Sequence, residues 1–347
     1  MHDEELLKEF EFFKVKEGRF RISLTTTCNA RCWFCHNEGS IPPIKIDGKN
    51  GLQHKTHTCS TQEYITLVET LIDLGISRLY FTGGEPLISP KLDPILESIP
   101  LHEKNEFKVI IATNGILLKK KLDSLSNKHI DKLKISLHAF SDESMWNIER
   151  TRSIDVVKAS IVQAKEIFPE IEINTLLMPE NQHEIMDIIQ FARDLQIDIE
   201  ILELVWTNYN RPTYTEKRLS TYDLAEELIK QGGREHINKP GIGVNLKMIE
   251  FENCSVRLMD NSLGSSYVGT CSACSLKSSC VEGFWSIRVD PEGFAQPCLL
   301  RTDLRIDLKP LIHDPESLKK FIPLWIGAFM KGIDISELNI LERVRNK

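Results

Sequence analysis

The sequence predicts an α/β fold, a partial (β/α)6 barrel of the TIM type followed by a small C-terminal domain. Two observations predict it: a short strand-like run followed by a helical segment recurs six times, and this alternation stops near residue 206. Such alternation indicates parallel strands joined by crossover helices. Six units fall short of the eight that close a full barrel, so an open or partial barrel is expected.

The six expected strands all lie before residue 206. They span residues 20–26, 78–82, 107–113, 132–138, 171–178 and 197–205. The helix expected over residues 61–74 is the clearest, because Ser60 and Glu63 form a capping box and Gly75 closes it. Its apolar side chains repeat at helical spacing, at Ile65, Val68, Leu71 and Ile72.

The end of the alternation divides the chain into three parts. Residues 15–206 are expected to form the barrel core, residues 207–270 a connecting helical segment, and residues 271–347 a C-terminal domain. A chain of 347 residues is long enough for one large domain and a small appendage, or for two domains of ordinary size.

Composition and charge restrict the function classes. The chain has 43 Lys and Arg against 50 Asp and Glu, a net charge of -7, which argues against nucleic acid or an anionic membrane surface as partner. No apolar run approaches the length of a membrane span, and the acidic start lacks the features of a signal peptide. We therefore expect a cytoplasmic protein with reduced thiols, in which nine cysteines in two groups indicate metal rather than disulfides.

The first group is Cys28, Cys32 and Cys35, three cysteines within eight residues and no fourth. A structural zinc site needs four protein ligands, and an ordinary 4Fe-4S cluster needs four thiolates. Three thiolates instead leave one iron open, which a metal site requires if it is to bind a substrate or cofactor. The alternative is zinc completed by His36 or a remote residue, although His36 directly follows Cys35 and simultaneous ligation would strain the backbone.

The second group is Cys271, Cys274, Cys280 and Cys298. Strand-like runs at 284–289 and 294–300 flank a turn at 290–293, and a hairpin there would bring the last two of these cysteines together. Four converging thiolates would close a second iron–sulfur cluster, with zinc as the alternative. Cys59 and Cys254 stand alone and are expected to be ordinary small apolar residues.

The spacing Cys28-x-x-x-Cys32-x-x-Cys35, with an aromatic residue at Phe34, resembles the signature of the radical S-adenosylmethionine (SAM) superfamily. The stretch "LYFTGGEPL" strengthens the resemblance, because Gly83, Gly84 and Glu85 follow the second strand, where the family's GGE motif meets the amino group of SAM. The resemblance further implies SAM contacts at the carboxyl ends of the third, fourth and fifth strands, from Thr113, Asn114, Ser136, His138 and Asn174.

This resemblance also implies a mechanism. SAM would chelate the open iron, and one electron from the cluster would cleave SAM to a 5'-deoxyadenosyl radical, so that Cys28, Cys32 and Cys35 are the residues on which catalysis depends. The radical would remove a hydrogen atom from a small-molecule substrate. An electron donor such as flavodoxin or ferredoxin is expected as a partner.

Over most of the chain the resemblance is to the GTP 3',8-cyclase type of molybdenum-cofactor biosynthesis, with a C-terminal "twitch" or half-SPASM auxiliary-cluster domain. The stretches "ISLHAFSDE" and "INTLLMPENQHEI" and the late cysteine group fall in the order of that family. The extra Cys280 departs from it, because the cyclase uses three cysteines there and leaves an iron open to its substrate.

Several positions that bind GTP in the cyclase type differ in this chain. Lysine and arginine positions of that family fall here on Tyr80, Glu172, Glu200 and Ser286, which leaves Arg21, Arg78 and Arg288. Carboxylates would repel a triphosphate, so we predict that GTP is not the substrate and that a nucleoside, sugar or amino acid derivative is. The alternatives are a maturase that modifies a ribosomal peptide and the GTP 3',8-cyclase itself.

Overall fold

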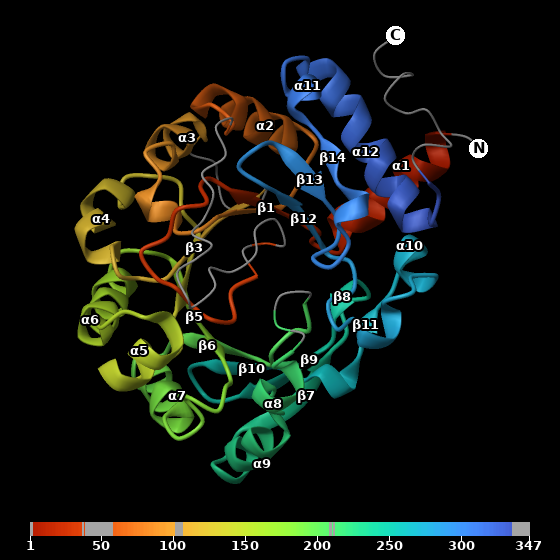
Figure 1. Cartoon of the computed structure of the whole chain (residues 1–347). Helices are drawn as coiled ribbons and strands as arrows, with labels where there is room; N and C mark the ends of the chain where they lie inside the picture. The colour runs from red at the N-terminus through yellow and green to blue at the C-terminus, as the bar shows by residue number, and fades with distance from the viewer. Residues whose placement is uncertain are drawn as a thin grey trace.

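The computed structural model describes residues 3–36, 38, 58–100, 107–207, 210 and 212–334. Within them, twelve strands form one sheet in the order β14-β13-β12-β1-β2-β3-β4-β5-β6-β10-β9-β7. The sheet curves around a central interior, and most of the helices lie outside it (Figure 1).

The six expected strands are present, and each pairs in parallel with the next. They are β1 (Arg19–Ser23), β2 (Arg78–Thr82), β3 (Lys108–Thr113), β4 (Lys132–Ser136), β5 (Glu170–Leu176) and β6 (Asp198–Leu202). The α/β fold with a partial barrel is therefore confirmed.

The crossover helices also follow the expected order. In α2 (Thr61–Asp73) the predicted capping box is present, because Ser60 Oγ accepts from the Glu63 amide and the Glu63 carboxylate accepts from the Ser60 amide. The other helices of the barrel are α3 (Leu92–Ser98), α4 (Leu118–Leu125), α5 (Asp142–Glu149), α6 (Ile154–Lys165) and α7 (Ile185–Asp194).

Side chains alternate between the two faces of the strands. Phe20, Ile22 and Phe81 are fully buried in the apolar core that the strands share with the helices. Because successive side chains point to opposite faces, Arg21 and Tyr80 lie on the other face, toward the barrel interior. This alternation makes the interior polar while the layer between strands and helices is apolar.

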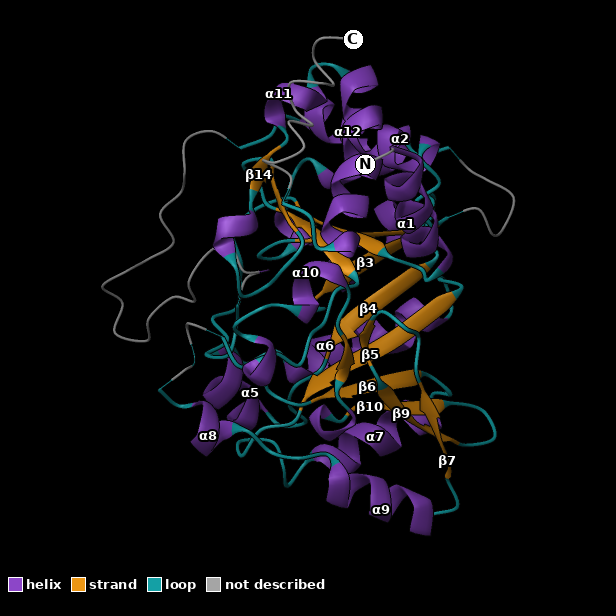
Figure 2. Cartoon of the chain, turned by 90° about the vertical axis from the view of Figure 1, so that its right-hand side faces the viewer, coloured by secondary structure: helices purple, strands orange, loops and turns teal. Residues whose placement is uncertain are grey.

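Strands from the C-terminal part widen the barrel on both sides. Strand β12 (Ser286–Val289) pairs in parallel with β1, and β10 (Ser255–Met259) pairs in parallel with β6 (Figures 1 and 2). The described chain thus contains eight adjacent parallel strands. The flanking strands β13 (Phe294–Gln296), β14 (Ile306–Asp307), β9 (Leu246–Glu250) and β7 (Arg234–Asn238) are antiparallel to their neighbours, and β8 (Gly243–Val244) and β11 (Ser265–Ser266) form a separate pair.

The segment 207–270 is only partly helical, contrary to expectation. It contains α8 (Tyr214–Lys217) and α9 (Tyr222–Lys230), but also β7, β9 and β10, which continue the barrel sheet. Strand β9 pairs antiparallel with both β7 and β10. No crossover helix separates these strands, so the strand–helix alternation that predicts the barrel core is absent from this segment. The expected hairpin at residues 284–300 is present as β12 and β13.

The N-terminal helix α1 (Asp3–Val15) lies against the C-terminal helix α12 (Pro315–Lys331). Phe13 stacks on Phe284 at 5.3 Å between ring centroids, and Phe284 contacts Phe329 at 4.5 Å. These rings join both ends of the described chain just before β12. The short helices α10 (Gly269–Ser272) and α11 (Lys309–Ile312) complete this side of the molecule (Figure 2).

Candidate active site

The loop that carries Cys28, Cys32 and Cys35 leaves the carboxyl end of β1 and is held there by the GGE segment. The Gly84 amide donates to Thr25 O at 2.7 Å, and the Glu85 amide donates to Thr27 O at 2.8 Å. A Cβ atom on Gly84 would lie 2.2 Å from Thr27 O, so the two backbones approach this closely only with glycine. The glycines predicted to admit a ligand therefore also fix the start of the cysteine loop.

Glu85 is buried and accepts three hydrogen bonds from its own chain. Its carboxylate accepts from Thr113 Oγ1 at 2.7 Å, from the Asn114 amide at 2.9 Å and from the Leu87 amide at 3.1 Å. Burial raises the pKa of Glu85 to about 7. The side chain thus holds the end of β3 in place, a role that the sequence-based assignment to the SAM amino group did not include.

Asn114 joins the end of β3 to the cysteine loop. Its amide nitrogen Nδ2 donates to Asn29 Oδ1 at 2.7 Å and lies 3.7 Å from Cys28 Sγ. Predicted site residues from three strand ends, Cys28, Glu85 and Asn114, are therefore connected by direct contacts.

Ser136, Asn174 and His138 lie at the ends of β4 and β5. Ser136 and Asn174 are register partners on the inner face, and the buried Asn174 Oδ1 has no hydrogen-bond partner among the described residues. Such an acceptor fits a ligand donor, because buried polar atoms are usually satisfied. His138 Nδ1 accepts from the Leu176 amide at 3.1 Å, and its ring meets the edge of Phe34 at 5.0 Å.

Burial lowers the pKa of His138 to about 4, so this imidazole is neutral at physiological pH. Asn181, which sequence reasoning missed, donates to the carbonyl oxygens of His138 and Leu176 at 2.8 Å each. It fixes the loop after β5 against β4. Its only sequence signal is its position in the loop that follows a strand.

The three cysteines of the first group are half-buried on one loop. Burial raises the pKa of Cys28 to about 12, and the nearby charges of Glu85 and Cys35 act in the same direction. Burial also raises the pKa of Cys32, together with Glu149. An iron–sulfur cluster binds thiolates, so the bonds to cationic iron would have to offset the free-energy cost of deprotonating these buried thiols. Three sulfur donors that influence one another on one loop fit an open iron–sulfur cluster.

The second group lies beside the β12–β13 hairpin. Burial raises the pKa of Cys271 to about 12, and Cys298, Cys280 and Cys274 raise it further, so the four sulfur atoms lie near one another. Leu300 donates its amide to Cys298 Sγ at 3.3 Å, and Leu276 donates to Cys274 Sγ at 3.4 Å. Across the described residues, no three His, Cys, Asp or Glu side chains are arranged tightly enough to hold a single metal ion.

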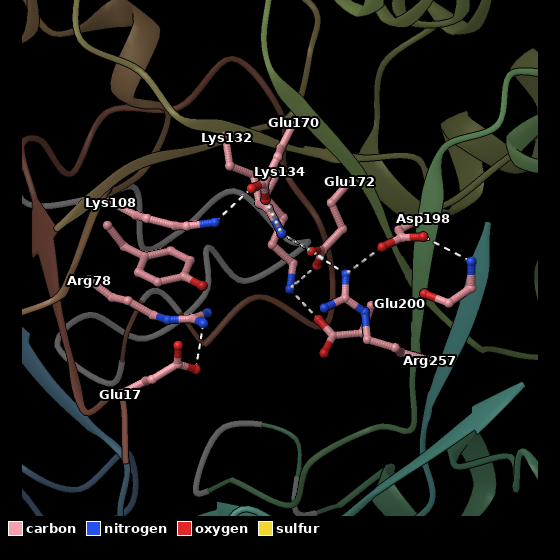
Figure 3. Close-up of polar contacts among 12 residues, drawn as sticks. Glu17, Arg78, Lys108, Lys132, Lys134, Glu170, Glu172, Asp198, Glu200 and Arg257 are labelled. Carbon is pink, nitrogen blue, oxygen red and sulfur yellow. Dashed lines mark hydrogen bonds and ion pairs between the residues drawn. The ribbon is translucent and has the colours of Figure 1, made fainter. Parts of the chain in front are cut away.

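The middle of the barrel interior contains an ion-pair network, formed by Lys132, Lys134, Glu172, Glu200 and Arg257 (Figure 3). Glu172 accepts from Lys132 Nζ at 3.0 Å and from Lys134 Nζ at 2.9 Å, and it also pairs with Arg257. Lys134 pairs in addition with Glu200. Although burial alone would raise it, Lys134, Arg257 and Lys132 hold the pKa of Glu172 well below its usual range.

Glu172 and Glu200 thus lie inside the barrel, as the sequence comparison requires, and each is neutralised by cations from other strands of the sheet. Sequence reasoning missed Lys134 and Arg257 as interior residues. The signal was available, because "KLKIS", "EIEIN" and "DIEIL" alternate charged with apolar residues, and the period of two places all the charges on one face.

A second set of ion pairs connects the cysteine loop to β12. Arg21 donates its Nε to both carboxylate oxygens of Glu38 at 2.9 Å, and Arg288 Nε lies 3.3 Å from the same carboxylate. Arg288 also pairs with Glu282 at 2.8 Å. Glu38 follows Cys35 by three residues, so these contacts tie the loop of the first cysteine group to the domain of the second.

The model of the radical SAM superfamily matches residues 22–192 of this chain. A probable GTP 3',8-cyclase of Methanococcus aeolicus is 29% identical over 332 residues, which cover 93% of this chain and 96% of the relative. A GTP 3',8-cyclase of Limosilactobacillus fermentum is 26% identical and covers 90% of this chain and 88% of its own length.

Solved structures share the fold at lower identity. SuiB of Streptococcus suis bound to S-adenosylmethionine covers 89% of this chain and 71% of its own, with a TM-score of 0.59 and 17% identity. Native anSMEcpe with bound AdoMet covers 90% and 82%, with a TM-score of 0.56 and 15% identity. At these identities the likeness extends to the fold alone, and it does not bear on whether a peptide is the substrate.

Among the helices of the described residues, none combines the length and apolar character that a membrane crossing requires. The matched residues 22–192 contain the cysteine loop, the GGE segment, the end of β1 and strands β2 to β5. Strand β6 lies outside the match. The family implies a 4Fe-4S cluster and SAM as cofactors. The matched domain, the arrangement of its motifs and the similarity to the relatives together show that the chain is a radical SAM enzyme.

Proposed function

We propose that Cys28, Cys32 and Cys35 hold a 4Fe-4S cluster with one open iron, and that SAM binds beside it at the carboxyl ends of β2 to β5. When bound and reduced, these cofactors supply a 5'-deoxyadenosyl radical that removes a hydrogen atom from the substrate. A one-electron donor of the flavodoxin or ferredoxin kind would provide the electron. The contact of Asn114 with Cys28 supports this placement most directly.

The chain's own residues position the cofactors and exclude water. Gly83 and Gly84 allow the backbone to approach the cysteine loop, and Glu85 fixes Thr113 and Asn114. Ser136 and Asn174 present polar side chains from the inner face, and the neutral His138 holds the ends of β4 and β5 together. Each acts by orientation, which in a shielded site lowers the cost of the reactive geometry.

The first candidate for the reaction is cyclisation of GTP. It is supported by the relatives that carry this name, because they align with nearly the whole chain and not only with the radical SAM domain. This favours the GTP 3',8-cyclase alternative over the sequence-based prediction of a different small molecule.

The second candidate is a small molecule without a triphosphate, and the barrel interior favours it. Tyr80, Glu172 and Glu200 replace cations of the cyclase type. The three cations that remain are already paired, Arg21 with Glu38, Arg78 with Glu17, and Arg288 with Glu38 and Glu282. A triphosphate would have to displace these carboxylates before it gained bidentate contacts.

One experiment separates the candidates. Anaerobically reconstituted enzyme is incubated with SAM and reductant, with and without GTP, and the products are separated by liquid chromatography with mass detection. A cyclised nucleotide identifies GTP as the substrate. Formation of 5'-deoxyadenosine without a cyclised nucleotide favours the second candidate, and absence of 5'-deoxyadenosine overturns the proposed function.

We also propose that residues 271–347 hold a second, fully ligated 4Fe-4S cluster, through Cys271, Cys274, Cys280 and Cys298. The influence of Cys298, Cys280 and Cys274 on the pKa of Cys271 supports this assignment. Iron analysis should give about eight irons per chain, falling to about four when the first cysteine group is removed. Zinc in the isolated protein, with iron for one cluster only, would contradict the assignment.

A further inference from the structure

Arg19 at the start of β1 lies on the inner face of the barrel between two aromatic side chains. Its guanidinium carbon is 4.1 Å from the ring centroid of Trp285 and 5.3 Å from that of Tyr80. Its Nη1 donates to Tyr80 Oη at 3.3 Å. Stacking on a ring face leaves the edge of a guanidinium group free for hydrogen bonds in its own plane.

Two N–H donors at this contact have no acceptor in the part of the chain that the structure describes. Arg19 Nε and Trp285 Nε1 are both buried and unpartnered among the described residues. Buried donors are normally paired, and a pair of unsatisfied donors on adjacent side chains indicates a missing acceptor. The group that would satisfy them must therefore offer oxygen atoms to both.

The charge of Arg19 is also uncompensated, unlike that of its neighbours. Every other cation of the inner face named above pairs with at least one carboxylate, whereas Arg19 forms no ion pair with a carboxylate in the described part of the chain. Burial lowers the pKa of Arg19, Tyr80 opposes this, and the positive charges of Arg78 and Arg21 lower it further, while the carboxylate of Glu200 raises it by less than any of these. A bound anion would relieve this excess positive charge.

This inference rests on the proposed binding of a small-molecule substrate in the barrel interior. We propose that Arg19, stacked on Trp285 and in contact with Tyr80, binds one oxyanion of the substrate, a carboxylate or a phosphate monoester. The planar fork of Arg19 matches two oxygens of such a group, and the indole N–H lies beside it. Arg19 thereby determines specificity for an end of the substrate that carries one carboxylate or one phosphate group, and the paired cations of the interior do not.

The test uses two simple anions as probes of the reconstituted holoenzyme with SAM. Sodium phosphate and sodium acetate are titrated separately, at constant ionic strength, and binding is followed by tryptophan fluorescence. Trp285→Phe identifies the share of the signal that comes from the indole next to Arg19. Arg19→Gln removes the charge, and Arg19→Lys keeps the charge but removes the planar fork.

The matched control is Lys108→Gln. Lys108 is a cation near the same end of the barrel, but it is already paired with Glu170 at 2.6 Å. Circular dichroism establishes that each variant is folded, and if Arg19→Gln does not fold, Arg19→Lys carries the comparison. Formation of 5'-deoxyadenosine by the unchanged enzyme tests the proposed function separately.

We expect saturable binding of at least one anion to the unchanged enzyme. The affinity should fall about ten-fold or more in Arg19→Gln and by less in Arg19→Lys. In Lys108→Gln it should fall by less than about two-fold. Tighter phosphate binding indicates a phosphate monoester, and tighter acetate binding a carboxylate. Equal affinity in the unchanged enzyme and both Arg19 variants overturns the proposal. So does the absence of saturable binding of either anion.

Discussion

The rim of the barrel and its interior are built in different ways. At the rim, two short segments, residues 25–35 and 83–85, are joined by backbone hydrogen bonds and by contacts too close for any residue but glycine. In the interior, each strand contributes one or two charges, which pair with charges from the next strand or from the strand beyond it. The rim is therefore a set of local motifs, while the interior depends on strand order and register.

This difference between rim and interior predicts which property a substitution in each region should affect. A change at the rim should act on SAM cleavage, because it displaces the cysteine loop or removes its ligands. A change in the ion-pair network should act first on stability, because it leaves a buried charge without a partner.

The largest effect is expected from the cysteines of the first group. Replacement of Cys28, Cys32 or Cys35 by Ala should abolish the formation of 5'-deoxyadenosine, because two thiolates do not hold the cluster. Liquid chromatography of anaerobic reactions measures the product. Cys254→Ala, in the turn between β9 and β10, is the control and should retain activity. Cleavage of SAM by the triple Cys variant would contradict the rim assignment.

The next effect is expected from Gly84→Ala. The added methyl group would overlap Thr27 O and push away the start of the cysteine loop. We expect the rate of SAM cleavage to fall by about 100-fold, the typical cost of a displacement of about 1 Å in an active site.

The control for this change is Gly232→Ala, where a Cβ would meet no atom within 4 Å although φ is +93°. It should lower stability by about 1–2 kcal/mol through backbone strain alone. Equal losses of SAM cleavage in both variants would show that the close approach at Gly84 is unimportant.

In the interior, Lys134→Met should lower the free energy of unfolding by about 2–4 kcal/mol, because Glu200 loses its lysine partner and Glu172 loses one of three cations. Urea unfolding of the variant and the unchanged protein measures the difference.

Lys319→Met provides the surface comparison. Lys319 of α12 pairs with Asp73 of α2 at 2.7 Å on the surface, and its loss should cost much less stability than the loss of Lys134, because solvent screens an exposed ion pair. If the two methionine variants are equally stable, the ion-pair network is not buried enough to differ from the surface.

The smallest effect is expected from Glu38 and depends on pH. Although burial alone would raise it, Arg21 and Arg288 hold the pKa of Glu38 at about 2, below its ordinary value of 4.5. A carboxylate whose pKa is lowered by folding contributes stability above its unfolded pKa, and this contribution is lost as the pH falls from about 5 toward 2. Up to about 3 kcal/mol is at stake.

Urea unfolding between pH 7 and pH 3 tests this prediction. Glu38→Gln should be less stable than the unchanged protein at pH 7, and its stability should change less as the pH falls. Glu226→Gln, on the exposed face of α9, should leave the profile as it is. Parallel profiles for Glu38→Gln and the unchanged protein would mean that Glu38 contributes no proton-linked stability.

The sequence by itself determined the six strands of the barrel core, the helix capped by Ser60, the hairpin of β12 and β13, and the rim motifs that indicate a radical SAM enzyme. These features depend on local signals, namely caps, period-two alternation and cysteine spacing, which act over a few residues. Only the tertiary structure decided that β10 and β12 join the barrel in parallel with β6 and β1, since such pairing links strands far apart in the sequence. It also decided the partners of Glu172, Glu200 and Glu38, and it left Arg19 without an ion-pair partner among the described residues, because ion pairing depends on the order of the strands and on their register.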